Sequence, residues 1–173
     1  TDTVYLSPAP LYHSAPLAFT VGVHSAGGTN VVMEKFDPAF ALELIERHRV
    51  THSQWVPTMF VRMLKLPDEE RTRFDLSSHR VAIHAAAPCP VEVKRRMIEW
   101  WGPIIVEYYG GTELNGMTLV RSDEWLAHPG SVGRAQIGRI RICDDNGDEV
   151  ATDTVGTVFF EGGPGFEYHN DPG

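Results

Sequence analysis

The sequence predicts an α/β fold in which a mostly parallel sheet is flanked by helices, followed by a small all-β region. Three observations support this prediction. Short apolar runs alternate with amphipathic segments of helical period over roughly the first 110 residues. The connections between these segments are short, as they are in parallel sheets covered by helices. After about residue 129, helical patterns stop and alternating patterns with frequent turns begin.

The individual elements follow from local patterns. We expect strands at residues 29–33, 51–56, 80–86 and 103–109, and helices at 36–50, 57–64 and 90–101. Asp37 is a good N-cap and Pro38 suits the first helical position. One face of the first helix carries Phe40, Ala41, Leu44, Ile45 and His48, and a stripe of the last carries Val93, Met97 and Trp101. The polar stretch before His79 predicts a surface loop or ragged helix, and the Asn-Gly pair at 146–147 predicts a hairpin.

Composition excludes several classes of protein. The 173 residues carry a formal net charge of −8, which argues against general nucleic-acid binding. Cys89 and Cys143 lie far apart, which indicates reduced thiols and a cytoplasmic protein. We find no apolar run that could span a bilayer and no signal peptide. The chain starts without Met and ends without a clear cap, so we expect it to be a piece of something longer.

Two segments leave predicted strands with chemistry suited to a ligand: "HAAAPCP" at 84–90 and "YYGGTE" at 108–113. In open parallel sheets, ligands bind at the carboxyl ends of the strands, so both segments should face one crevice. Tyr109 can stack on a flat base, Thr112 can contact a phosphate, and Glu113 offers an oxygen to Mg²⁺. A glycine turn with a cap is the alternative, because Gly-Gly-Thr also occurs at 27–29.

An ordered series of motifs resembles the adenylate-forming superfamily of acyl-CoA synthetases, firefly luciferase and the adenylation domains of peptide synthetases. The segments are "PLYHSAP" (10–16), "VPTMFVRML" (56–64), "HAAAPCP", "YYGGTE", "GSVGRA" (130–135), "IRICDDNGDEV" (140–150), "VGTVFFEGG" (155–163) and "YHNDPG" (168–173). The resemblance covers essentially the whole chain. It implies that residues 1–128 carry part of the AMP and acyl sites, and that 129–173 begin a β subdomain.

The resemblance also implies roles for individual residues. The cofactor-binding set would be Ala85, Ala86, Ala87, Pro88, Glu107, Tyr108, Tyr109, Gly110, Gly111 and Thr112. In this set Tyr109 would stack on adenine, the 85–88 backbone would line the adenine pocket, and Glu107 would meet the adenine amino group or nearby polar atoms. The family often has Gly where Ala85 stands.

The catalytic residues implied by the resemblance are Thr112, which would contact the α-phosphate, Glu113, which would hold Mg²⁺, and His13, which would lie by the acyl carboxylate. An inconsequential loop histidine is the alternative for His13. The other histidines show no metal-ligand spacing and are interpreted as structural, with His84 the main exception because it borders the pocket.

The implied reaction joins ATP and a carboxylic acid into an acyl-adenylate and pyrophosphate, after which coenzyme A displaces AMP. We find no Ser-His-Asp arrangement and no G-x-S-x-G elbow, so no activated nucleophile is expected. Short-acid relatives have Trp at the position of Gly110, so glycine there predicts an open acyl pocket. The small apolar segment 17–26 would form a tunnel wall. We therefore expect a medium- or long-chain fatty acid or another bulky apolar acid.

Several alternatives stay open. An aryl-CoA ligase or other adenylating enzyme fits the same motifs, whereas an amino-acid adenylation domain would usually carry an acidic residue near 10–16, where none is found. A non-catalytic nucleotide-binding module is a further alternative. The family's upstream phosphate loop, its ribose-binding carboxylate and its C-terminal lysine domain are absent from the sequence. We therefore expect this chain to be inactive by itself.

Overall fold

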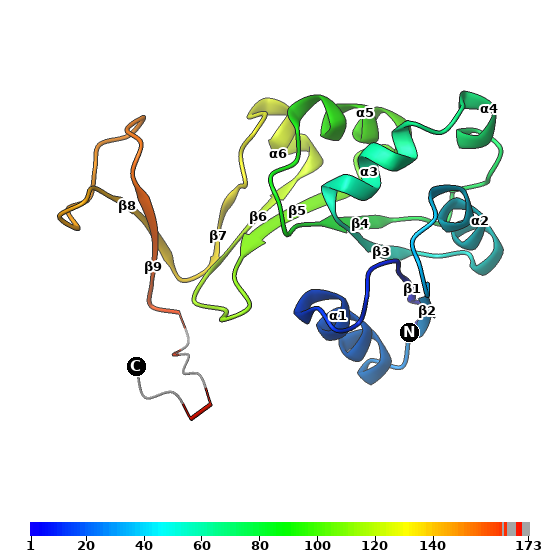
Figure 1. The fold of residues 1–173 in the computed structure, drawn as a ribbon, viewed down its shortest axis with the longest axis horizontal. Coiled ribbons are helices and arrows are strands. Elements are labelled where there is room, and N and C mark those ends of the chain that lie inside the picture. Colours follow the sequence, from blue (N-terminus) through cyan, green and yellow to red (C-terminus); the bar gives the residue numbers. More distant parts are fainter. Residues whose placement is uncertain (164, 166–168, 171–173) are drawn as a thin grey trace.

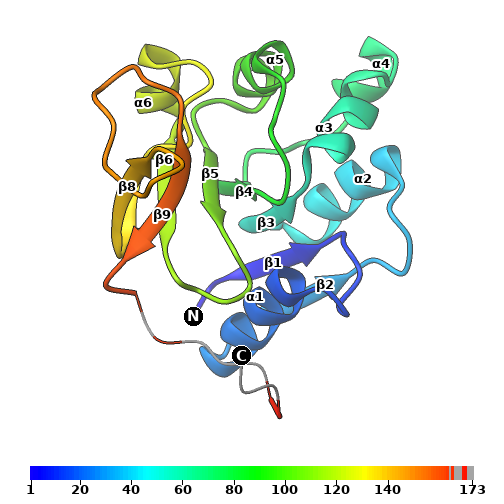
Figure 2. The same ribbon diagram turned by 60° about the vertical axis from the view of Figure 1, so that its left-hand side comes forward.

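A computed structural model describes residues 1–163, 165 and 169–170 of the chain. A seven-stranded sheet forms its centre, with the strand order β2-β1-β3-β4-β5-β6-β7 (Figures 1 and 2). These strands are β1 (Val4–Ser7), β2 (Thr29–Val32), β3 (His52–Trp55), β4 (Val81–His84), β5 (Ile105–Gly110), β6 (Met117–Arg121) and β7 (Arg134–Ile137). The strands from β2 to β5 run parallel, and β6 and β7 are antiparallel to their neighbours.

Helices cover both faces of this sheet. On one side lies α1 (Ser14–Ser25); on the other lie α2 (Pro38–His48), α3 (Pro57–Leu64), α5 (Val91–Trp101) and α6 (Ser122–Ala127) (Figures 1 and 2). A single turn, α4 (Asp68–Arg71), interrupts the polar stretch in which a loop or ragged helix was expected. The predicted class, a mostly parallel sheet with flanking helices, is confirmed.

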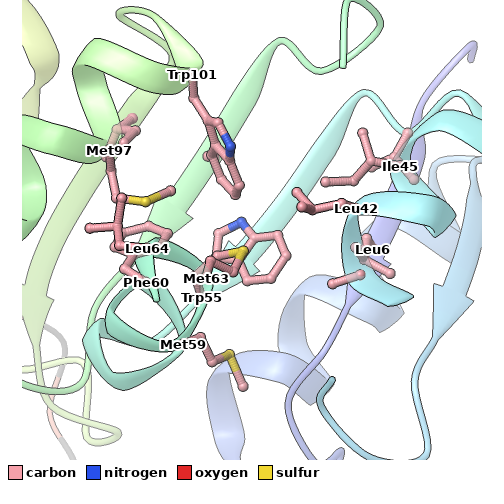
Figure 3. Packing of buried hydrophobic residues seen from close by; sticks show 14 of the residues in the cluster. Leu6, Leu42, Ile45, Trp55, Met59, Phe60, Met63, Leu64, Met97 and Trp101 are labelled. Carbon is pink, nitrogen blue, oxygen red and sulfur yellow. The ribbon is translucent and has the colours of Figure 1, made fainter. Parts of the chain in front are cut away.

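The main hydrophobic core lies between the sheet and α2, α3 and α5. Trp55 on β3 is fully buried there, with its ring 5.4 Å from that of Trp101 and 6.3 Å from that of Phe60 (Figure 3). Aromatic rings at these centroid distances gain attraction beyond their buried area. The core therefore fixes α3 and α5 against β3 and β4, the strands that lead into the candidate site.

The helix following β2 confirms one local prediction and corrects another. Asp37 caps α2 as expected, because its carboxylate accepts a hydrogen bond from the Phe40 amide at 2.9 Å. The predicted apolar face is partly wrong: Phe40 is 44% exposed and His48 is also exposed, whereas Leu42 is fully buried. The buried stripe is thus rotated toward Leu42, since the helix packs on the sheet with residues 41, 42, 44 and 45.

The region after β5 holds elements that were not predicted from local patterns. Residues 117–121 form β6 and 122–127 form α6. Beyond residue 129, β7 pairs with β6 and so extends the main sheet. A separate antiparallel pair consists of β8 (Arg139–Cys143) and β9 (Thr157–Glu161). The domain boundary near residue 129 stays a prediction.

The Asn-Gly turn forms at the expected place. The amide of Gly147 donates to the carbonyl of Asp144 at 3.1 Å, and Gly147 has a φ of +88°, which suits glycine. Cys143, before the turn, forms an isolated bridge with Glu149, after it. The full strand partner of β8 is β9. The motif at 168–173 lies mostly outside the described residues.

Candidate nucleotide site

Three loops meet at the carboxyl edge of the parallel strands. They follow β1 (residues 8–13), β4 (residues 85–90) and β5 (residues 111–116). The register of β4 and β5 aligns His84 with Glu107, so Ala85 and Ala86 leave the sheet beside the strand that carries Tyr108 and Tyr109. The two segments expected to share one crevice are thus neighbours at the same edge.

A hydroxyl contact connects the first loop to the third. Ser14 Oγ lies 3.1 Å from Thr112 Oγ1, although the two residues are 98 positions apart. Ser14 is the first residue of α1, and no side chain caps the amino end of that helix. Free amides and the positive end of the helix dipole favour anions at such a position. The Thr112 hydroxyl therefore lies beside the amino end of α1.

His13 immediately precedes α1 at this point. It occupies the N-cap position with extended backbone, is exposed, and has its ring 4.5 Å from that of Tyr12. Because Ser14 touches Thr112, the neighbouring His13 backbone also lies close to the third loop. The sequence missed Ser14, since a serine at a helix start ordinarily indicates no more than local capping.

The loop after β4 has an unusual backbone. Ala86 is exposed and has a φ of +77°, a conformation that side chains other than glycine seldom adopt. Ala85 is buried, while Ala87 and Pro88 are exposed. Strained backbone of this kind persists where surrounding structure holds it and often occurs at ligand sites. The loop therefore presents its backbone to solvent at the place where adenine was expected.

Tyr109 is 46% exposed, so its ring is not packed into the interior. Its centroid lies 6.1 Å from that of Phe160 on β9, and the two ring planes differ by 28°. The sequence did not single out Phe160. Tyr108 is half-buried on the opposite side of the strand, with its ring 6.3 Å from that of Phe19 on α1, and burial raises the pKa of its hydroxyl.

The two glycines between Tyr109 and Thr112 allow close approaches. A Cβ at Gly111 would collide with the Glu113 carboxylate, which folds back over this residue. A Cβ at Gly110 would lie 2.9 Å from the carbonyl oxygen of Gly116. The open space expected beside Gly110 is therefore not found there, and the expectation is corrected: the backbone of Gly116, just before β6, fills the position. Gly110 is required by strand packing.

Glu107 does not face the crevice. Its carboxylate is buried, lies 2.5 Å from Nζ of the fully buried Lys94, and lies 3.6 Å from Nε2 of His84. Glu107 thus meets neighbouring polar atoms, one of the two expected partners, and its contact with the adenine amino group stays a prediction. Lys94 was missed, although it interrupts the 94, 97, 98, 101 stripe of α5, and a charge in an apolar stripe is a detectable signal.

His84 and Cys89 border the same buried cluster. Burial, with a smaller contribution from Lys94, lowers the pKa of His84 to about 3, so its ring is neutral at pH 7. Burial also raises the pKa of the Cys89 thiol to about 11, so the thiol stays protonated. Neither ring nitrogen of His84 has a hydrogen-bond partner among the described residues. The nucleotide-facing surface consequently lacks an activated nucleophile from either residue.

An apolar hollow of about 350 Å³ lies along α1. Ala18, Phe19, Gly22, Val23, Ala26 and Thr3 line it. Apart from Thr3, every lining residue belongs to the segment 17–26 that was expected to form a tunnel wall. Phe19 connects the hollow to the site, because its ring also contacts Tyr108.

The candidate site offers a metal ion one carboxylate, that of Glu113. Within residues 1–163, no group of three or more His, Cys, Asp and Glu side chains could hold an ion. Mg²⁺ usually keeps several waters and binds through one or two carboxylates together with substrate phosphates. Glu113, next to Thr112, fits that donor set when a phosphate supplies the remaining oxygens.

Comparison with known proteins gives consistent relatives. Residues 1–166 match the family described as AMP-binding enzyme. The chain is 33% identical over 161 residues to a medium/long-chain-fatty-acid–CoA ligase, FadD8, from Mycobacterium tuberculosis, covering 91% of this chain and 28% of that protein. It is 39% identical over 134 residues to 4-coumarate–CoA ligase-like 6 from Oryza sativa subsp. japonica, covering 76% and 22%.

Solved structures show the same fold. The amide bond synthetase McbA from Marinactinospora thermotolerans superposes with a TM-score of 0.77 at 28% identity, covering 91% of this chain and 32% of that one. ATP-bound MatB from Rhodopseudomonas palustris gives a TM-score of 0.75 at 30% identity, covering 91% and 31%. The chain thus spans between about a fifth and a third of the length of these relatives. With a family match over nearly its whole length, the chain belongs to the AMP-binding enzyme family.

Proposed function

We propose that the protein carrying this chain is an AMP-forming acid–CoA ligase whose acid is a medium- or long-chain fatty acid or another bulky apolar acid. One observation carries the proposal: the Ser14–Thr112 contact brings the amino end of α1 to the third loop, near the loop that holds the positive-φ residue Ala86, while an apolar hollow lies farther along α1. A nucleotide, a phosphate and an apolar tail each have a chemically suitable surface there.

Different residues would bind the base, the phosphate, the metal ion and the acid. The 85–88 backbone and the Tyr109 ring hold adenine from two sides, and stacking on such a ring contributes about 1–3 kcal/mol. Thr112 and the amino end of α1 hold the α-phosphate, and Glu113 holds Mg²⁺, which would neutralise phosphate charge as the carboxylate attacks. His13 would stand next to the acyl carboxylate. Catalysis then depends on positioning and on charge neutralisation, since two anions must meet.

Coenzyme A would accept the acyl group in a second step. The Cys89 thiol is half-buried and protonated, which leaves the cofactor's own thiol as the attacking group. Cys89 and Cys143 are both free in the structure, and we retain the prediction of a cytoplasmic protein from this usage. No helix among the described residues has the length and apolar character to cross a bilayer.

An aryl-CoA ligase is the second candidate, because the rice relative is a 4-coumarate–CoA ligase-like protein at 39% identity. Thioester formation by the full-length natural polypeptide separates the two. We would supply ATP, Mg²⁺ and CoA with saturated acids of graded length and with hydroxycinnamic acids. Preference for long saturated acids supports the proposal, preference for aromatic acids supports the second candidate, and no thioester with any acid refutes both.

The activity of this chain alone is a separate matter. It spans only part of its relatives' length, and the sequence holds neither the phosphate loop nor the ribose carboxylate expected from the family. We expect it to bind AMP weakly and to catalyse no adenylation. Exchange of radiolabelled pyrophosphate into ATP above background by residues 1–173 would refute this expectation.

A further inference from the structure

Beneath the candidate site lies a buried ionic cluster for which the proposed chemistry has no use. Lys94 is completely buried, Glu107 is 6% exposed, and their charged atoms lie 2.5 Å apart. Lys94 Nζ also lies 4.8 Å from the ring centroid of Trp125 on α6. His84 on β4 faces the same carboxylate from 3.6 Å. The cluster thus joins β4, β5, α5 and α6 at one point.

Each charged partner belongs to a helix or strand that adjoins one of the two loops proposed to hold adenine. Lys94 is in the first turn of α5, which begins immediately after the 85–90 loop. Glu107 lies on β5, two residues before Tyr109. A change in the distance between these two side chains would therefore shift the 85–88 backbone relative to the Tyr109 ring.

Stability alone does not explain an ion pair at this position. Removing two charges from water costs as much as, or more than, their attraction returns, and well-packed apolar pairs of similar volume are often at least as stable. An ion pair nevertheless differs from an apolar pair in having a defined length and direction. Apolar side chains tolerate small slides of a helix over a sheet, whereas a charge-assisted hydrogen bond does not.

We propose that the Lys94–Glu107 ion pair is a positioning device that holds the 85–90 loop and the 108–113 loop at the separation required for adenine. The inference rests on the proposed function for its kinetic consequence. The two residues touch neither nucleotide nor acid, and they act through Ala86 and Tyr109. His84 contributes as a neutral neighbour that fills the space beside the carboxylate.

The main test replaces both charges with apolar groups of similar length, in the double variant Lys94→Met and Glu107→Met of the full-length natural polypeptide. We expect a folded protein whose KM for ATP is about tenfold higher. The 85–88 backbone and the Tyr109 ring would no longer be held at a fixed separation, and the binding of adenine between them would weaken. The KM for the acid should change less than threefold. The single variant Glu107→Gln keeps an amide oxygen that can accept from Lys94, so its KM for ATP should stay near that of the original protein, although the uncompensated Lys94 charge lowers its stability.

A matched control lies elsewhere in the same core. Ser53 Oγ and His79 Nε2 form another buried polar contact, at 2.6 Å, and His79 precedes β4 at the opposite edge of the sheet. The variant His79→Phe should change stability while leaving the KM for ATP within about twofold of the original. An equal rise in KM for this control would overturn the proposal, because any core change would then suffice.

A second measurement does not depend on catalysis. Amide hydrogen exchange of the ligand-free protein should accelerate in both 85–90 and 108–113 in the double variant, and in neither segment in His79→Phe. If the original protein forms no acyl-adenylate, the proposed function fails while this measurement still tests the positioning role. A folded double variant with unchanged loop exchange and unchanged KM for ATP would overturn the inference.

Discussion

The hydroxyl oxygens of Ser14 and Thr112 lie 3.1 Å apart and join the amino end of α1 to the loop after β5. Only one of these hydroxyls belongs to the set expected from the sequence. The contact brings the amino end of α1 to the predicted phosphate position. It also allows the effects of removing the Ser14 hydroxyl and the Thr112 hydroxyl to be compared at one site.

The variant Thr112→Val keeps the side-chain shape and removes the hydroxyl. We expect the rate of acyl-adenylate formation in the full-length polypeptide to fall roughly a hundredfold, the usual scale for losing one preorganised donor to a developing charge. Ser14→Ala, the matched control, should lower the rate by less than about fivefold because Thr112 remains. Single-turnover assays with radiolabelled ATP measure both rates, and equal losses would contradict the assignment.

Tyr109 should determine affinity for the base. Removing its ring in Tyr109→Ala deletes a stacking surface worth about 1–3 kcal/mol, so the Kd for AMP should rise by a factor of about 5 to 150. Tyr109→Phe retains the ring and should bind within about twofold of the original. Isothermal titration with AMP measures these affinities, and equal weakening by both variants would show that the hydroxyl, not the ring, makes the contact.

The apolar hollow beside α1 gives a sharper test of acid length than Gly110, where the backbone of Gly116 already occupies the position of a side chain. Nothing lies within 4 Å of a Cβ built on Gly22. Gly22→Leu should therefore fit, raise helix propensity, and fill the hollow. We expect preference to shift toward shorter acids in a competition assay of thioester products. Leu17→Ala, a change at an exposed position of the same helix, should leave the preference unchanged.

His79 predicts how stability depends on pH. Burial lowers the pKa of this side chain to about 4, below its ordinary value of 6.5. Between pH 6.5 and pH 4, His79 is protonated in the unfolded state but stays neutral in the folded state. The free energy of unfolding therefore falls as pH drops from 6.5 to 4. His79 contributes about 3 kcal/mol of this loss, and the buried His84 adds a loss of its own over the same pH range, so the total loss should shrink by about the His79 share in His79→Phe. Urea unfolding followed by tryptophan fluorescence at several pH values measures it; identical pH slopes for both proteins would contradict the assignment.

Much of the fold was predictable because local rules and tertiary packing agree. The Asp37 cap and the Asn-Gly turn depend on interactions within a few residues, and β2, β3, β4 and β5 carry short apolar runs that are visible in the local sequence. Prediction failed where long-range pairing decides the outcome. Residues 117–121 form β6 because they pair in antiparallel with β5. β7 pairs with β6 in the main sheet, whereas the strands that follow it, β8 and β9, pair with each other.

Short motifs in a fixed order were enough to predict the family, the parallel sheet and the residue types of the 84–90 and 108–113 loops. The directions of individual side chains became known from the folded structure. It turned Glu107 inward onto Lys94, placed Ser14 against Thr112, and filled the space beside Gly110 with the backbone of Gly116. Strand pairing and helix packing bring together residues far apart in the chain, and no local pattern records which atoms then meet.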